Sequence, residues 1–211
     1  MRSALWAMTA LLGLATSTHA AILTFDHNFE FSGGSQPSGA APWLRATFDD
    51  GGGSGSVTLT FTGLNLVNQE FVRFTYFNLD PAINPASLSF STPTKVGAFS
   101  DPTITTGTNA FQADGDGLYD VQIEFDNSPP ANRFGPGEAV TYTITAPGLT
   151  ANSFNFLSAP AGGSGPFPTA AHVQGIGSSG QFSGWTTQVP EPASLGLTAL
   201  GALAGLRRRR R

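Results

Sequence analysis

The sequence predicts an all-β protein, built as an antiparallel β-sandwich that is jelly-roll-like. Apolar and polar residues alternate over several short segments, which is the pattern of strands with one buried face. Clusters of Gly, Pro, Asp and Asn separate these segments and are typical of tight turns. The 17 Phe residues suit an aromatic core between two sheets, and no window of the central region has the 3.6-residue period of a capped helix.

Four segments carry the strand pattern most clearly. Residues 56–63 (SVTLTFTG) and 140–146 (VTYTITA) alternate apolar residues with threonine, and residues 119–126 (YDVQIEFD) alternate in the same way. Residues 70–79 (EFVRFTYFNL) are apolar on nearly both faces, which predicts a central strand covered on each side. The shorter strand candidates are residues 21–26, 43–48, 87–91, 152–158 and 171–174.

The chain divides into three predicted parts: a signal peptide at residues 1–20, an exported β-sandwich domain at 21–187 and a sorting signal at 188–211. Arg2 begins the first part, an apolar run follows at residues 4–15, and Ala20 supplies a small residue at the expected cleavage site. An N-terminal anchor helix is the alternative. The chain has no Cys, so the exported domain would be held by its core alone, or by a bound metal.

Charge is distributed unevenly along the chain. Of its ten basic residues, six lie at the two ends, whereas thirteen of the fourteen acidic residues lie in the domain between them. The domain therefore holds four basic and thirteen acidic residues, a net charge of about −9. Such a surface repels nucleic acid and anionic lipid and attracts divalent cations, so we expect no nucleic-acid partner.

The C-terminal end predicts a short transmembrane helix. Residues 193–206 are fourteen residues without a charge, and as a helix they would span about 21 Å, less than the ~30 Å of a bilayer core. Five arginines follow: Arg207, Arg208, Arg209, Arg210 and Arg211. They would act as a cytoplasmic stop signal that leaves the domain outside. Pro190 and Pro192 favour an extended, accessible peptide before this segment. A buried core helix is the alternative.

The same end resembles the PEP-CTERM sorting signal, since VPEPAS (residues 189–194) precedes a Leu/Ala/Gly span and a terminal arginine cluster. The resemblance implies that an exosortase, a membrane transpeptidase system of Gram-negative bacteria, recognises Pro190, Glu191 and Pro192. It also implies a protein that signal peptidase and exosortase process, that is held transiently in the inner membrane, and that then reaches the outer surface or extracellular matrix. Exopolysaccharide and biofilm often accompany this system. The processing cysteine lies in the exosortase, so no catalytic residue carries over.

One loop of the domain predicts a calcium site. Its sequence is QADGDGLYD, residues 112–120, and its possible ligands are Gln112, Asp114, Asp116 and Asp120. Calcium takes six to eight oxygen ligands, and glycines permit the sharp bend that brings such ligands together. The loop is similar to the D-x-D-G-D-G-x-x-D loops of integrin-type repeats, with Gln112 in place of the first Asp. A hairpin turn with solvated acids is the alternative.

Aromatic and histidine residues offer few further candidates. Trp43 and Trp185 are possible platforms for stacking against sugar rings, although packing in the core or at its rim is the alternative for each. His27 and His172 lie far apart in the sequence, and no metal site is predicted from them.

These observations favour a non-enzymatic, exported surface or extracellular-matrix protein that is sorted by exosortase and associated with exopolysaccharide. A lectin-like carbohydrate-binding module with structural calcium is the main alternative. A secreted glycan hydrolase is a further alternative, which would need two carboxyl groups across a cleft. The sequence lacks the hydrolase motif G-x-S-x-G and the zinc motif H-E-x-x-H, and we expect no cofactor other than calcium.

Overall fold

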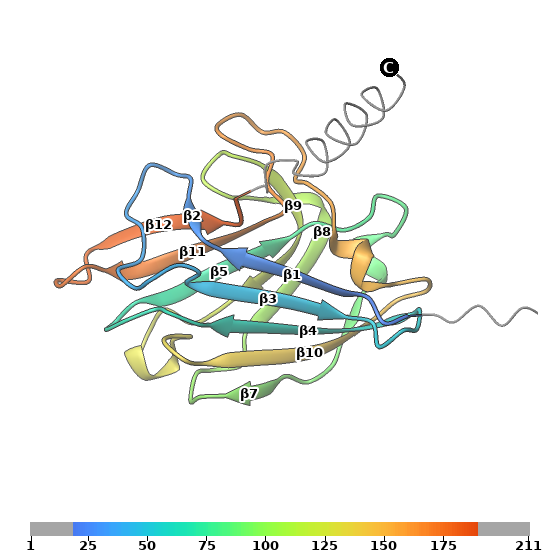
Figure 1. Cartoon of the computed structure of the whole chain (residues 1–211), viewed down its shortest axis with the longest axis horizontal. Coiled ribbons are helices and arrows are strands. Elements are labelled where there is room, and N and C mark those ends of the chain that lie inside the picture. The colour runs from blue at the N-terminus through green and yellow to red at the C-terminus, as the bar shows by residue number, and fades with distance from the viewer. Residues whose placement is uncertain (1–18, 190–211) are drawn as a thin grey trace, which may run out of the picture.

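The computed structural model describes residues 19–189, which form two antiparallel β-sheets connected by loops and three short 3-10 turns (Figure 1). The strands of sheet A, in spatial order, are β1 (Ile22–His27), β3 (Leu44–Asp49), β4 (Ser56–Gly63), β10 (Ala139–Thr145) and β6 (Ser89–Phe90), with β7 (Thr94–Val96) also paired to β10. The strands of sheet B are β2 (Phe29–Glu30), β12 (Phe182–Thr187), β11 (Thr169–Ile176), β5 (Phe71–Phe77), β9 (Leu118–Glu124) and β8 (Thr103–Gln112). The 3-10 turns are η1 (Pro85–Ser87), η2 (Pro130–Asn132) and η3 (Ala151–Phe154).

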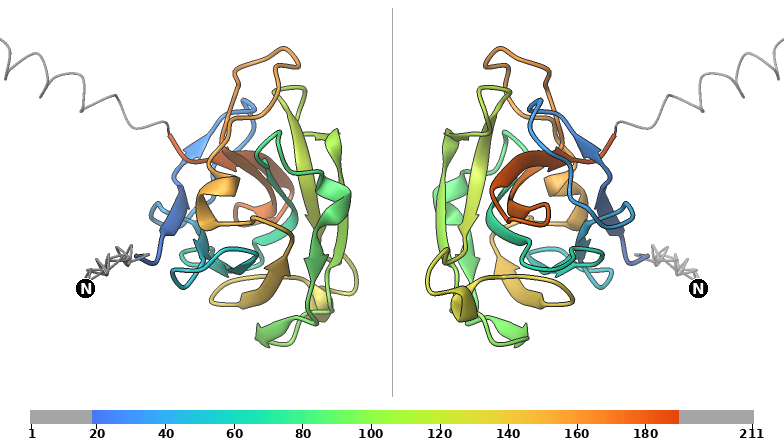
Figure 2. Two further views of the ribbon diagram at one scale, coloured as in Figure 1. Left: turned by 90° about the vertical axis from the view of Figure 1, so that its right-hand side faces the viewer. Right: turned by 90° about the vertical axis from the view of Figure 1, so that its left-hand side faces the viewer.

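The two sheets face each other across one aromatic core, and Figure 2 shows their strands on opposite sides of it. Phe61 of sheet A lies at its centre, with its ring stacked against those of Phe125 and Phe134 and edge-on to that of Phe77. Phe48 stacks on Phe154 at a centroid distance of 4.2 Å. The prediction of an all-β fold with two antiparallel sheets is therefore confirmed.

Strands β4 and β10 show why alternation predicts this fold. They pair directly, so that Phe61 lies opposite Val140 and Thr60 lies opposite Thr141. The apolar members point into the core, whereas the two threonine hydroxyl groups are 3.1 Å apart on the other face. Cross-strand threonine pairs and β-branched residues stabilise such a sheet face.

Strand β5 is central in sheet B, between β11 and β9, as the apolar segment 70–79 predicts. Val72 and Phe77 belong to the core between the sheets. Tyr76 belongs instead to a second cluster on the outer face of sheet B, together with Phe31, Ala113, Tyr119, Phe167 and Ala170. Loops on this outer face cover Tyr76, so the strand is buried on both sides.

One predicted strand is wrong, and four strands were not predicted: β2, β7, β8 and β12. Residues 152–158 lie in η3 and the loop after it, because Thr150 and Ser153 form a capping box that closes a turn and directs Phe154 inward. Strand β8 lies at the edge of sheet B and is exposed along most of its length, so it lacks the apolar alternation that marks a half-buried strand. Strand β12 is short, and its outward Phe182 obscures the pattern.

The described residues contain two hydrophobic clusters, built from side chains between residues 21 and 185. The larger cluster includes residues from both sheets, and the smaller one lies on sheet B. We therefore expect a fragment of residues 21–189 to fold by itself. None of the helices within residues 19–189 is long and apolar enough to cross a membrane. The predicted C-terminal helix, and the predicted signal peptide up to residue 18, lie outside the described residues.

Candidate functional site

The predicted calcium loop joins β8 to β9, and each of its three acidic side chains has a different environment. Asp116 is buried, and its carboxylate accepts a hydrogen bond from the backbone N–H of Ser164 in a neighbouring loop. Asp120, already within β9, accepts hydrogen bonds from the backbone N–H groups of Leu79 at 2.9 Å and Asn109 at 2.8 Å. Asp114 is exposed at the tip of the loop.

This arrangement ties two loops together, and the acidic side chains of the predicted calcium loop do not converge on one point. Gln112 is exposed at the end of β8, where it pairs with Leu118. Within residues 19–189, no three His, Asp or Glu side chains converge as ligands of a metal ion. The facing loop fits only because it is glycine-rich: a Cβ added to Gly163 would lie 1.3 Å from a carboxylate oxygen of Asp116. The Asp/Gly pattern is accounted for by this packing of loop on loop.

The two tryptophans have opposite environments. Trp43 is 3% exposed in the core between the sheets, and its indole N–H donates a hydrogen bond to the Gly39 carbonyl at 2.8 Å. The prediction that Trp43 offers a platform for sugars is therefore wrong, because both faces of the ring are packed inside the domain. Trp185 is half-buried on the outer face of sheet B and remains a candidate.

Trp185 belongs to a row of rings that crosses three neighbouring strands. It lies opposite His172 of β11, and His172 lies opposite Phe74 of β5. The rings of Trp185 and His172 are parallel to within 9°, with centroids 4.8 Å apart, and those of His172 and Phe74 to within 5°, at 6.4 Å. All three side chains are half-buried. We call Trp185, His172 and Phe74 the aromatic row.

A β-bulge places charged groups at the end of the aromatic row. Val173 pairs with Val72 and His172 with Phe74, so Arg73 is an extra residue in β5. Bulges redirect side chains in this way. The Arg73 guanidinium lies 4.9 Å from the centre of the Phe74 ring and forms an ion pair with Glu124 of β9. The outer face therefore presents half-buried aromatic side chains beside hydrogen-bonding groups, which is the composition of surfaces that contact amphipathic ligands.

The surroundings of His172 in this row favour the neutral form of its ring. Burial, together with the nearby charge of Arg73, lowers the pKa of His172. The sequence did not predict His172 or Phe74 as site residues, because their alignment with Trp185 depends on which strands pair and in which register. The only local signal was that Phe74 follows a basic residue in an otherwise apolar strand.

His27 lies in the interior and has a structural role. Its Nδ1 atom is 3.1 Å from the carbonyl oxygen of Thr186, to which it donates, and the ring packs edge-on against Phe61. The ring is fully buried, and its burial lowers the pKa of His27 to about 4. It does not approach His172, which lies on the outer face of sheet B, so the two histidines form no shared site.

The buried His27 predicts acid sensitivity of the fold. An unfolded chain protonates this ring near pH 6.5, whereas the folded domain does so only near pH 4. Unfolding therefore takes up a proton between these values, and this histidine should lower the free energy of unfolding by about 3 kcal/mol as the pH falls through that window. Chemical denaturation at several pH values measures the slope.

The variant His27→Gln should remove this contribution to the slope. The matched variant His172→Gln should remove less of it, because a half-buried ring loses less hydration than a fully buried one. Equal slopes for His27→Gln and the unchanged domain would show that His27 is not the group responsible.

Comparison with known families bears on the C-terminal end of the chain. The family model of the PEP-CTERM protein-sorting motif matches residues 188–211. The chain carries a PEP-CTERM sorting motif. The sequence-based prediction is confirmed, and the motif implies an exported protein that an exosortase processes after transient anchoring in the membrane.

The comparisons give no comparable assignment for the domain. Among solved structures, the crystal structure of a family IIIa CBD from Clostridium cellulolyticum is similar over 74% of this chain and 92% of that chain, at 11% sequence identity and a TM-score of 0.29. So low a TM-score supports no inference about the ligand. A search of curated proteins found no match to the sequence.

Proposed function

We propose that this PEP-CTERM protein is a non-enzymatic component of the cell surface or extracellular matrix, and that its β-sandwich associates with exopolysaccharide. The sorting motif supports delivery across the inner membrane, where signal peptidase and exosortase would trim the two ends. The proposal includes a jelly-roll-like fold, which is supported by the repeated crossing of the chain between the two sheets.

The aromatic row is the single observation that carries the proposed binding role. Sugar rings present C–H faces that pack on aromatic side chains, and hydroxyl groups that need hydrogen-bond partners. Trp185, His172 and Phe74 provide aromatic surface for the C–H groups. The ion pair of Arg73 with Glu124, at the end of the row, provides hydrogen-bond partners for the hydroxyl groups. A row that crosses adjacent strands suits an extended polymer better than a single small molecule.

A binding role is favoured over catalysis by the way the buried acids are used. The Glu70 carboxylate accepts hydrogen bonds from the backbone N–H groups of Ser38 at 2.7 Å and Val67 at 2.9 Å. Asp116 and Asp120 hold backbone N–H groups in the same manner. Carboxyl groups fixed as acceptors for loops have a structural use, whereas a hydrolase needs a pair that faces substrate.

Binding to exopolysaccharide purified from the producing cells tests this proposal. We expect the fragment of residues 21–189 to cosediment with the polymer, and Trp185→Ala to weaken binding about fivefold to tenfold, because an aromatic contact contributes roughly 1 kcal/mol. Phe182→Ala is the matched control, since Phe182 is 57% exposed on the same strand but lies outside the aromatic row. Equal binding by both variants, or no binding by the unchanged fragment, would contradict the proposed role of the row.

A further inference from the structure

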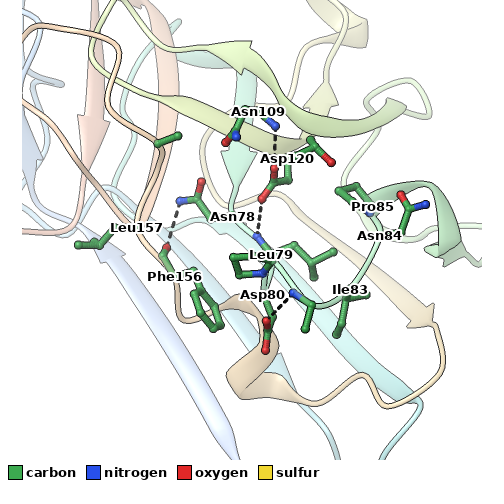
Figure 3. Close-up of a pocket in the computed structure, with 14 residues that line it drawn as sticks. Asn78, Leu79, Asp80, Ile83, Asn84, Pro85, Asn109, Asp120, Phe156 and Leu157 are labelled. Carbon is green, nitrogen blue, oxygen red and sulfur yellow. Dashed lines mark hydrogen bonds between the residues drawn. The ribbon is translucent and has the colours of Figure 1, made fainter.

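A cavity of about 540 Å³ opens at one end of the sandwich, away from the aromatic row. Its walls come from the chain after β5, from β8 and β9, and from the segment after η3 (Figure 3). The volume is within the range of sites that hold small organic ligands. Its polar lining residues are Asn78, Asp80, Asn84, Thr108, Asn109 and Asp120. The side chains of Asn78, Asp80 and Asp120 are held in place by hydrogen bonds to the backbone.

Asn78 is held rigidly and has an unused acceptor. The residue is 2% exposed, and the two amide hydrogens of its side chain are shared among the carbonyl oxygens of Phe156 at 3.1 Å, Phe167 at 3.1 Å and Pro168 at 2.9 Å. Figure 3 shows the nitrogen directed to Phe156, with the amide oxygen on the other side. Within the described part of the chain, this Oδ1 atom has no hydrogen-bond partner. This oxygen is not among the described buried atoms that lack a partner, so it is reached from the cavity, where a ligand hydroxyl group or a water molecule can donate to it.

The carboxylates of Asp80 and Asp120 are also fixed acceptors. Asp120 is 8% exposed, and the N–H groups of Leu79 and Asn109 hold its carboxylate in place. Asp80 accepts from the N–H of Ala82 at 2.8 Å, which orients its carboxylate within a tight turn. Carboxylate oxygens have lone pairs beyond those used here. None of the described residues that line the cavity is basic and two of them are acidic, so the lining disfavours an anionic ligand, whereas ligand hydroxyl groups can donate to the fixed acceptors.

Apolar groups complete the lining. Leu79, Ile83 and Phe156 line the cavity, and Leu157, which is 58% exposed, lies at its edge. Hydroxyl donors directed at Asn78 and Asp120, combined with C–H groups against these side chains, describe a single sugar ring. We propose that the cavity binds one neutral saccharide unit, and that Asp80 and Asp120 exclude uronic acids by charge repulsion. This sugar site rests on the proposed association with polysaccharide and extends it. The cavity would hold a chain end or a branch, and the aromatic row would bind the chain itself.

Titration of the isotope-labelled fragment 21–189 with single sugars, followed by NMR, tests the proposal. The neutral probes are glucose, galactose and mannose, and the charged counterparts are glucuronate and galacturonate. We expect saturable shifts of the backbone amide signals of Leu79, Asn109 and Leu157 with at least one neutral sugar, and binding at least about tenfold weaker for its uronate.

Two surface variants keep the test independent of folding. Leu157→Trp should abolish the shifts by filling the cavity mouth, and Asp80→Asn, which retains the acceptor that closes the turn, should keep binding of the neutral sugar and relax the exclusion of uronates. Phe182→Ala is the control outside the cavity. No saturable shift with any neutral sugar, uronate binding as tight as neutral binding, or shifts that persist in Leu157→Trp would overturn the proposal. If the cavity binds no sugar but the polymer still binds in a Trp185-dependent way, the sugar site is wrong and the proposed function is retained.

Discussion

Replacement of Pro190, Glu191 and Pro192 by alanine is expected to leave the protein as an unprocessed precursor in the inner membrane. The matched motif and the predicted stop signal of five arginines act at different steps, since the arginines hold the C-terminal end and the Pro-Glu-Pro sequence is what the exosortase is expected to recognise. The triple variant should therefore be exported and retained, and none of it should reach the outer surface. Fractionation of the producing cells with immunodetection of the domain measures this.

The variant Ser194→Ala is the control for this experiment, because it changes a neighbouring residue and keeps the Pro-Glu-Pro sequence intact. It should be distributed like the unchanged protein. Surface delivery of the triple variant at the normal level would show that the motif is not used for sorting in this chain.

The second large effect is expected from Phe61→Ala in the centre of the core. Phe61 is fully buried, and its ring lies within 6.5 Å of those of Phe77, Phe125 and Phe134. Removal of a buried aromatic ring loses its transfer free energy and leaves a cavity, which lowers the free energy of unfolding by about 3–5 kcal/mol. For a domain without disulfides, this is a large share of the roughly 5–15 kcal/mol that stabilises most folded domains. Chemical denaturation of the fragment 21–189 measures the loss.

Phe182→Ala serves as the matched variant, because it removes the same ring from a site that is 57% exposed. Its effect should stay within about 0.5 kcal/mol. A loss in Phe61→Ala no greater than that in Phe182→Ala would contradict the assignment of Phe61 to the centre of the core.

Sequence reasoning predicted the strands whose apolar residues follow a regular pattern, either on one face, as in β4 and β10, or on both faces, as in β5. In β4 and β10 large apolar residues alternate with threonine, and each of these large apolar residues is buried in the core between the sheets. Strand β8 could not be predicted in this way, because most of its side chains face solvent and its pairing with β9 is interrupted between Thr106 and Phe111. The order of strands within each sheet depends on contacts between distant segments, which no local pattern specifies.

The candidate sites show the same limit. The Asp/Gly loop looked like a cation site because spacing alone does not reveal that Asp116 and Asp120 would be used by backbone N–H groups from elsewhere in the chain. Trp185 was predicted as a platform, but its alignment with His172 and Phe74 follows from the register of three strands. The unpaired oxygen of Asn78 depends on three carbonyl groups from distant residues, so it has no sequence signature.

The intact mass of the protein recovered from exosortase-containing cells tests the account most directly. We expect a surface or matrix fraction that has lost residues 1–20 and the arginine cluster, and a heavier form that keeps the C-terminal end when the exosortase is deleted. A single species of full-length mass in the cytosol of both strains would contradict export, sorting and the role in the matrix together.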